Sequence, residues 1–203
     1  MGGGALLRLK KPAEINIGLD IDYTVLKKWT PPPDINLICT DAVRFLKHYP
    51  YKGDEFVYAD PPYIRSARRS KRSIYRFEYT EDQHLELLKL LTTLPCRVMI
   101  SGYSSTLYSS YLGHWRHISF ETRNRAGGKA TESIWMNYPE PEQLHDYRFL
   151  GNSFRERERI KRRIERWKER FRTMPQLERN ALLLALSNDI SNSEPGQKSD
   201  GLC

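Results

Sequence analysis

The chain has 203 residues, 39% of them hydrophobic, which is enough for one domain with a buried core and a short appendage. Its net charge of +8 favours a polyanionic partner. No apolar run is long enough to span a membrane, and the three widely separated cysteines fit neither a disulfide framework nor a metal site, so we expect a cytoplasmic protein.

The first 60 residues alternate short apolar runs with helical stretches, which predicts a parallel sheet with crossover helices. We expect strands at 15–21, 36–39 and 55–59, and helices at 23–29 and 42–49. Asp41 is placed to cap the second of these helices. The third strand ends at the tetrapeptide Asp60-Pro61-Pro62-Tyr63.

Beyond the tetrapeptide, residues 64–78 are basic and show no clear period, so we expect a loop. Thr80 and Gln83 then form a capping-box pattern that predicts the start of a helix. We expect strands at 96–100, 115–121 and 131–138 and a helix at 104–112. The last two strands read as an antiparallel pair, a recurrent variation at the end of a parallel sheet.

The composition changes after Pro141. Residues 153–172 predict one helix that carries ten Lys and Arg and an apolar stripe at helical spacing, and residues 175–186 predict a second. From Ser187 the chain is polar and is predicted to be disordered. We therefore expect a catalytic domain over 1–140, a basic helical appendage over 151–187 and a disordered tail over 188–203.

The tetrapeptide at 60–63 has the residue types needed to activate a planar amine, although Asp and Pro also favour ordinary turns. The Asp60 carboxylate and the Pro61 carbonyl can each accept one N–H, which frees the nitrogen lone pair. The prolines hold that carbonyl rigidly. Tyr63 offers an aromatic face for a base taken out of a duplex. Its position after a parallel strand is where ligands bind in open α/β sheets.

A second signal lies at the start of the chain. Gly2, Gly3 and Gly4 would allow the backbone to approach a ligand closely, and Asp20 ends a strand about sixteen residues later, as a ribose-binding acid does. A glycine run after an initiating methionine is also typical of a cloning remnant, and the pattern alone is weak.

With these motifs in this order, the chain resembles the Dam-like adenine-specific DNA methyltransferases from Gly2 to about Tyr138. The resemblance implies a Rossmann-like α/β fold that uses S-adenosylmethionine, with a mostly parallel sheet and a C-terminal helical appendage. It implies cofactor contacts from Gly2 and Gly4 (methionine part), Asp20 (ribose) and Asp41 (adenine), and catalysis by Asp60, Pro61, Pro62 and Tyr63. The implied reaction is methylation of the N6 amine of a flipped adenine in double-stranded DNA.

The chain departs from the pattern of this family in two ways. The family has about thirty residues before the glycine loop, including a strand, so we expect a sheet that lacks its first strand. Many relatives also insert a target-recognition region before the tetrapeptide, whereas Asp41 and Asp60 here are too close for one.

The basic residues around the tetrapeptide are the candidate DNA contacts. They are Arg65, Arg68, Arg69, Lys71, Arg72 and Arg76, followed by Arg123, Arg125 and Lys129. A solvated loop is the alternative. The helix at 153–172 could also bind DNA, but its interspersed glutamates favour a packed amphipathic appendage.

Other chemistries stay open from sequence alone. His84, His114, His117 and His145 show no metal-ligand spacing, so we expect structural or surface roles and no metal. We also expect a monomer. The tetrapeptide would also serve cytosine or RNA amines. An inactive remnant that only binds DNA is the non-enzymatic alternative.

Overall fold

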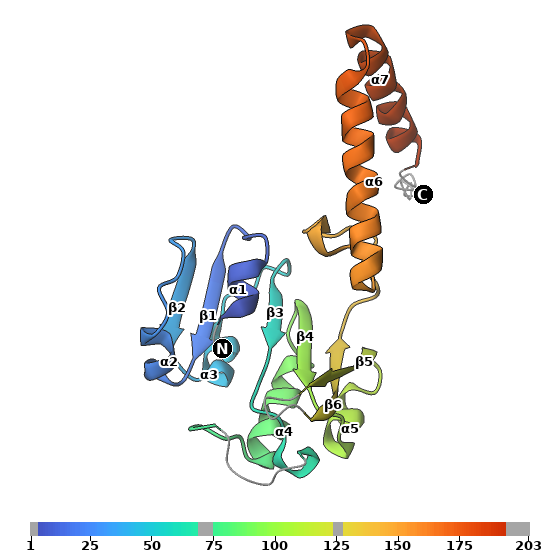
Figure 1. Cartoon of the computed structure of the whole chain (residues 1–203). Coiled ribbons are helices and arrows are strands. Elements are labelled where there is room, and N and C mark those ends of the chain that lie inside the picture. The colour runs from blue at the N-terminus through green and yellow to red at the C-terminus, as the bar shows by residue number, and fades with distance from the viewer. Residues whose placement is uncertain (1–3, 69–74, 124–127, 194–203) are drawn as a thin grey trace, which may run out of the picture. The chain divides into compact units, whose positions relative to one another are not determined.

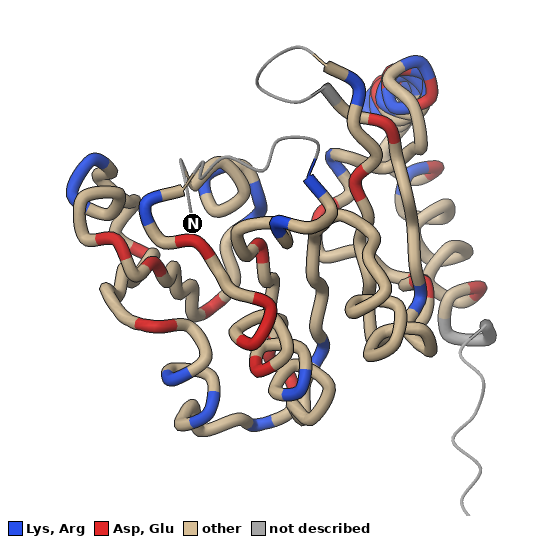
Figure 2. Tube along the Cα trace, turned by 90° about the horizontal axis from the view of Figure 1, so that it is seen from below, with Lys and Arg blue, Asp and Glu red and all other residues tan. Residues whose placement is uncertain are grey.

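The computed structural model describes residues 4–68, 75–123 and 128–193. It divides into two compact units, Met1–His145 and Asp146–Cys203. Figure 2 shows Lys and Arg spread along the trace of the first unit and gathered on one long helix of the second. Within the described ranges, no helix combines the length and the apolar character needed to cross a membrane.

The strands of the first unit form two sheets (Figure 1). They are β1 (Asn16–Asp20), β2 (Ile35–Cys39), β3 (Phe56–Ala59), β4 (Arg97–Gly102), β5 (Arg116–Arg123) and β6 (Lys129–Met136). Strands β1 and β2 pair in parallel, and the second sheet has the order β3-β4-β6-β5. Within it, β3 and β4 are parallel, whereas β6 is antiparallel to both β4 and β5. The predicted antiparallel last pair is confirmed. The sheet that we predicted as one is instead two, because β1 and β3 are not paired with each other.

Helix α1 (Ala5–Leu9) precedes β1 and was not predicted. The other helices follow strands in the predicted crossover order: α2 (Tyr23–Lys27), α3 (Ala42–His48), α4 (Glu81–Leu91) and α5 (Thr106–Leu112), with a short 3₁₀ turn at Arg65–Ala67. Asp41 caps α3 by accepting from the Arg44 N–H, as predicted. Thr80 and Gln83 form the predicted reciprocal capping box at the start of α4.

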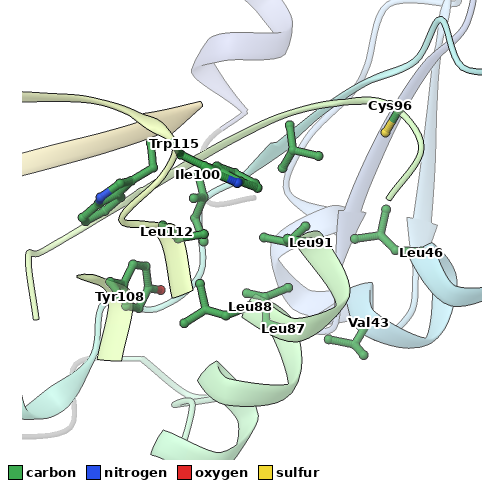
Figure 3. Close-up of a cluster of buried hydrophobic side chains, with 12 residues drawn as sticks. Val43, Leu46, Leu87, Leu88, Leu91, Cys96, Ile100, Tyr108, Leu112 and Trp115 are labelled. Carbon is green, nitrogen blue, oxygen red and sulfur yellow. The ribbon is translucent and has the colours of Figure 1, made fainter. Parts of the chain in front are cut away.

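The core of the first unit lies where α4 and α5 pack against β4 and β6 (Figure 3). Leu88, Leu91, Val98, Ile100 and Leu112 have no exposed surface. Each such aliphatic side chain contributes about 1.5–3 kcal/mol of transfer free energy when fully buried. The core therefore holds β4 rigidly beside β3, whose end carries the tetrapeptide.

The second unit is a 3₁₀ turn at Tyr147–Phe149 followed by two helices, α6 (Phe154–Thr173) and α7 (Gln176–Ser193). Ser153 caps α6 by accepting from the Glu156 N–H. Helix α7 extends to Ser193, so the prediction that the chain is disordered from Ser187 is wrong for residues 187–193. No proline or glycine interrupts the sequence between Pro175 and Pro195, so nothing ends the helix at Leu186.

Candidate active site

Three aspartates stand at or just after the carboxyl ends of three strands. Asp20 is the last residue of β1, Asp41 follows β2 by two residues, and Asp60 directly follows β3. Strands β1, β2 and β3 run in the same direction in Figure 1, so these ends share one side of the unit. That side is where open α/β sheets bind their ligands.

Asp60 is held by a hydrogen bond from the neighbouring strand. The Ser101 hydroxyl, near the end of β4, donates to Asp60 Oδ1 at 2.9 Å. Ser101 is 4% exposed, whereas the Asp60 side of the site is open to solvent. No other hydrogen bond to the Asp60 side chain occurs among the described residues. Its second carboxylate oxygen is therefore available to accept an N–H from a substrate.

Tyr63 is fixed by two contacts from the same sheet. Its hydroxyl donates to Glu132 Oε2 at 3.1 Å, and its ring meets the Tyr103 ring edge-on with 4.7 Å between centroids. Burial raises the pKa of the Tyr63 hydroxyl, and the Asp60 and Glu132 carboxylates raise it further. Tyr63 is therefore neutral, and its ring is held beside Asp60 in one orientation.

A second tyrosine completes the polar cluster. The Tyr58 hydroxyl, on β3, shares a hydrogen bond with the Ser101 hydroxyl at 3.1 Å. Burial raises the pKa of Tyr58, and the Asp60 and Glu132 carboxylates act in the same direction. Two neutral phenols thus flank two carboxylates, and the hydrogen bonds link strands β3, β4 and β6.

His84 lies under the tetrapeptide turn and is fully buried. Its Nδ1 is 3.1 Å from the Tyr108 hydroxyl. Burial and the nearby Arg68 guanidinium lower the pKa of His84 to about 4, with the Pro62 backbone among the groups that oppose the shift. The structure confirms a structural role for this histidine and makes it a neutral support for the turn.

The residues predicted to bind the cofactor already take part in local contacts. Asp20 Oδ1 accepts from the Asp22 N–H at 2.8 Å, and Asp41 Oδ1 accepts from the Arg44 N–H. Gly4 has a φ of +63°, and a Cβ there would lie 3.2 Å from the Trp29 ring, so local packing alone explains this glycine. Gly2 lies outside the described residues.

A cavity of about 280 Å³ borders Asp41 between α3 and α4. It is lined by Asp41, Val43, Arg44, Lys47, His48, Tyr79, Gln83 and Glu86. This is near the lower end of small-molecule sites, roughly 300–1,000 Å³, and is large enough for one planar base. Among the described residues, no group of three or more His, Cys, Asp or Glu is arranged to hold a metal ion.

Arg68, one of the predicted DNA contacts, is placed differently from that expectation. It is 6% exposed and forms a bidentate ion pair with Glu78, at 3.0 and 2.7 Å. A guanidinium satisfied in this way is not presented to phosphate. Desolvation favours this pairing, because a buried arginine without a carboxylate partner would be strongly destabilising.

The other predicted DNA contacts are scattered. Arg65 and Arg76 are exposed, and Arg76 lies 3.4 Å from Asp22. Lys129 lies 3.9 Å from Glu121 and is highly exposed. Arg123 ends β5, and only its backbone is described. Arg69, Lys71, Arg72 and Arg125 lie outside the described residues.

The segment that contains the tetrapeptide is similar to a known protein family. Residues 30–124 match the family of D12 class N6 adenine-specific DNA methyltransferases. The match contains β2 to β5 and the whole tetrapeptide. A search of curated proteins gave no match.

The match over residues 30–124 confirms the resemblance to adenine-specific DNA methyltransferases and the α/β fold predicted from sequence. It also supports DNA adenine methyltransferase activity. Methyltransferases of this kind generally use S-adenosylmethionine. Ser101 and Glu132 were not among the site residues predicted from sequence. Only the pairing of β4 with β3 and β6 brings these side chains to Asp60 and Tyr63.

Proposed function

We propose that this chain transfers a methyl group from S-adenosylmethionine to the N6 amine of an adenine flipped out of double-stranded DNA. The observation that carries the proposal is the fixed Asp60 carboxylate, with one oxygen bound to Ser101 and the other available, inside a segment of the adenine-specific family.

The activation step is a matter of hydrogen-bond geometry. The free oxygen of Asp60 accepts one N–H of the amine, and the Pro61 carbonyl accepts the other. Both contacts draw the nitrogen toward a tetrahedral shape and release its lone pair for attack. Ser101 keeps the carboxylate from rotating, so the acceptor is oriented before substrate arrives.

Tyr63 supports recognition of the extruded base. Its ring is locked by Glu132 and Tyr103, so it offers a rigid face on which adenine can stack. Stacking on an aromatic residue contributes about 1–3 kcal/mol per base. Glu132 thus acts as a positioning residue through Tyr63.

The residues that would hold the cofactor are the two acids at the ends of β1 and β2. Asp20 is suited to ribose hydroxyls, and Asp41 borders the cavity that would take the adenine. S-Adenosylmethionine, when bound, supplies an electrophilic methyl group. Asp41 has a second carboxylate oxygen beyond the one that the Arg44 N–H occupies.

The test is incubation of the full chain with methyl-labelled S-adenosylmethionine and DNA of mixed sequence, followed by nucleoside analysis. We expect label in N6-methyldeoxyadenosine. Asp60→Ala is expected to lower the rate by at least about 10²-fold while cofactor binding, measured by calorimetry, is retained. Wild-type turnover by this variant would contradict the mechanism.

Asp54→Ala is the matched control, because Asp54 is an exposed aspartate in the loop before β3. It is expected to keep full activity. Label in methylated cytosine, or only with an RNA substrate, would assign the chemistry to another amine. No label with any nucleic acid would favour an inactive DNA-binding protein.

A further inference from the structure

Helix α6 carries a face on which arginines predominate. Its twenty residues span about 30 Å. Six arginines recur at spacings of three or four residues, which places them on one side of the helix. They are Arg155, Arg159, Arg162, Arg163, Arg166 and Arg170, and all six are exposed. We call this set the arginine face.

The acidic residues of α6 do not neutralise this face. Three ion pairs join neighbouring side chains on the helix: Arg159 with Glu156, Lys168 with Glu165, and Arg172 with Glu169. Only the first involves the arginine face. Within the described part of the chain, Arg155, Arg162, Arg163 and Arg166 form no ion pair.

Like charges three or four residues apart destabilise a helix by a few tenths of a kcal/mol per pair. The arginine face therefore carries unfavourable repulsion that an anionic partner would relieve. The helix has eight arginines and two lysines. A guanidinium matches phosphate with two parallel hydrogen bonds, which an ammonium cannot do.

The apolar stripe of α6 lies on a different side. It consists of Ile160, Ile164, Trp167 and Phe171, again at spacings of three or four residues. A phosphate ligand can therefore approach the arginine face without displacing the apolar stripe from whatever it contacts.

We propose that the arginine face of α6 binds the phosphate backbone of duplex DNA, as a contact separate from the tetrapeptide site. B-DNA presents one charge per about 1.7 Å of axis, so a row of guanidinium groups about 22 Å long, from Arg155 to Arg170, meets several phosphates at once. The choice of DNA over an anionic membrane surface rests on the proposed function. Contacts to phosphates carry no sequence information, so the proposed binding is independent of sequence.

The experiment compares two full-length variants of equal charge. In the first, Arg162, Arg163 and Arg166 are changed to Gln. In the second, Lys161, Lys168 and Arg172, which lie on another side of α6, are changed to Gln. Both lose three positive charges, and Gln is a good helix former. Fluorescence anisotropy with a labelled duplex of arbitrary sequence is measured over a series of salt concentrations.

We expect the first variant to bind about tenfold more weakly and to lose up to about 0.9 from the salt slope for each phosphate contact removed. The control is expected to keep most of the affinity and the slope. Equal losses in both variants would reduce the effect to net charge and overturn the proposal. So would unchanged DNA binding in the first variant with loss of binding to anionic phospholipid vesicles.

The binding assay needs no methyl transfer, so it separates this proposal from the proposed function. Asp54→Ala, the exposed control introduced above, is expected to bind the duplex as wild type does. If methylation is absent but the arginine-face variant still weakens DNA binding, the face is established and the enzymatic proposal fails. Intact methylation with no effect of the variant on DNA binding would overturn the DNA-binding role of the face and leave the enzymatic proposal standing.

Discussion

Helices α4 and α6 both begin at a hydroxyl N-cap with a matching Gln or Glu three residues later, yet they depend on different interactions. In α4, Leu87, Leu88 and Leu91 are at most 3% exposed and belong to the core. Helix α6 has no buried residue along its twenty positions. Because most helical stability in proteins comes from packing of an apolar face, α4 is stabilised by the fold and α6 largely by its own backbone and surface pairs.

The difference between the two helices has a functional consequence. The side chains of the tetrapeptide site depend on β3, β4 and β6, which the core around α4 holds in register. Precise geometry is needed there, because activation of the amine depends on two correctly placed acceptors. Binding of phosphates by α6 needs only a row of exposed charge, which tolerates local motion.

The largest effect is expected from truncating the core. Leu88→Ala should lower the free energy of unfolding of the first unit by about 2–5 kcal/mol, because the side chain is fully buried and its removal leaves a cavity. Ile164→Ala on α6, where the side chain is 46% exposed, should cost less than about 1 kcal/mol. Urea denaturation followed by circular dichroism measures both. Equal losses would show that α6 is as well packed as α4.

Much of the first unit was predictable because its signals are local. The periodicity of apolar residues located its strands and helices, the caps at Asp41 and Thr80 were read correctly, and the tetrapeptide fell at the end of a strand. Contacts between distant residues were not predictable. The burial of Arg68 against Glu78 and the approach of Glu132 to Tyr63 across 69 residues depend on tertiary packing, which no spacing rule encodes.

Helix α7 shows the same limit in the second unit. Its polar stretch after Leu186 matched the composition of a disordered tail, yet it continues as a helix to Ser193. Composition predicts whether a segment can bury enough apolar surface, whereas the end of a helix depends on local stop signals.

A smaller effect is expected from the buried histidine. The pKa of His84 is lowered from about 6.5 in an unfolded chain to about 4 in the fold. Between these values the unfolded chain binds a proton that the folded chain rejects. Stability is therefore complete above about pH 6.5 and falls by up to about 3 kcal/mol as the pH drops toward about 4.

Unfolding measured from about pH 7 to about pH 4 tests this for wild type and His84→Gln. The variant should lose less stability than wild type over this interval, although it starts from a lower value because it disturbs the contact with Tyr108. His114→Gln is the control, since His114 is exposed and should leave the wild-type profile unchanged. Parallel profiles for wild type and His84→Gln would show that His84 is not the responsible group.

The smallest expected effect uses the same chemical change in both regions. Thr80→Ala removes the hydroxyl that accepts from the Gln83 N–H, and Ser153→Ala removes the one that accepts from the Glu156 N–H. Losing such a cap costs about 1 kcal/mol of helix stability.

In α4 the loss destabilises the whole cooperative unit, because unravelling the first turn exposes buried His84 and loosens the packing of the leucines behind it. Thr80→Ala should therefore lower the melting temperature of the first unit by about 2–4 °C.

In α6 the same loss frays a turn that has no buried residue. Ser153→Ala should therefore leave the melting temperature of the first unit unchanged and only raise amide exchange over the first turn of α6. Calorimetry and hydrogen exchange on the two variants measure these outcomes side by side. A shift in the first-unit melting temperature caused by Ser153→Ala would mean that the two units unfold together, and the contrast between a packed helix and a self-supporting one would then fail.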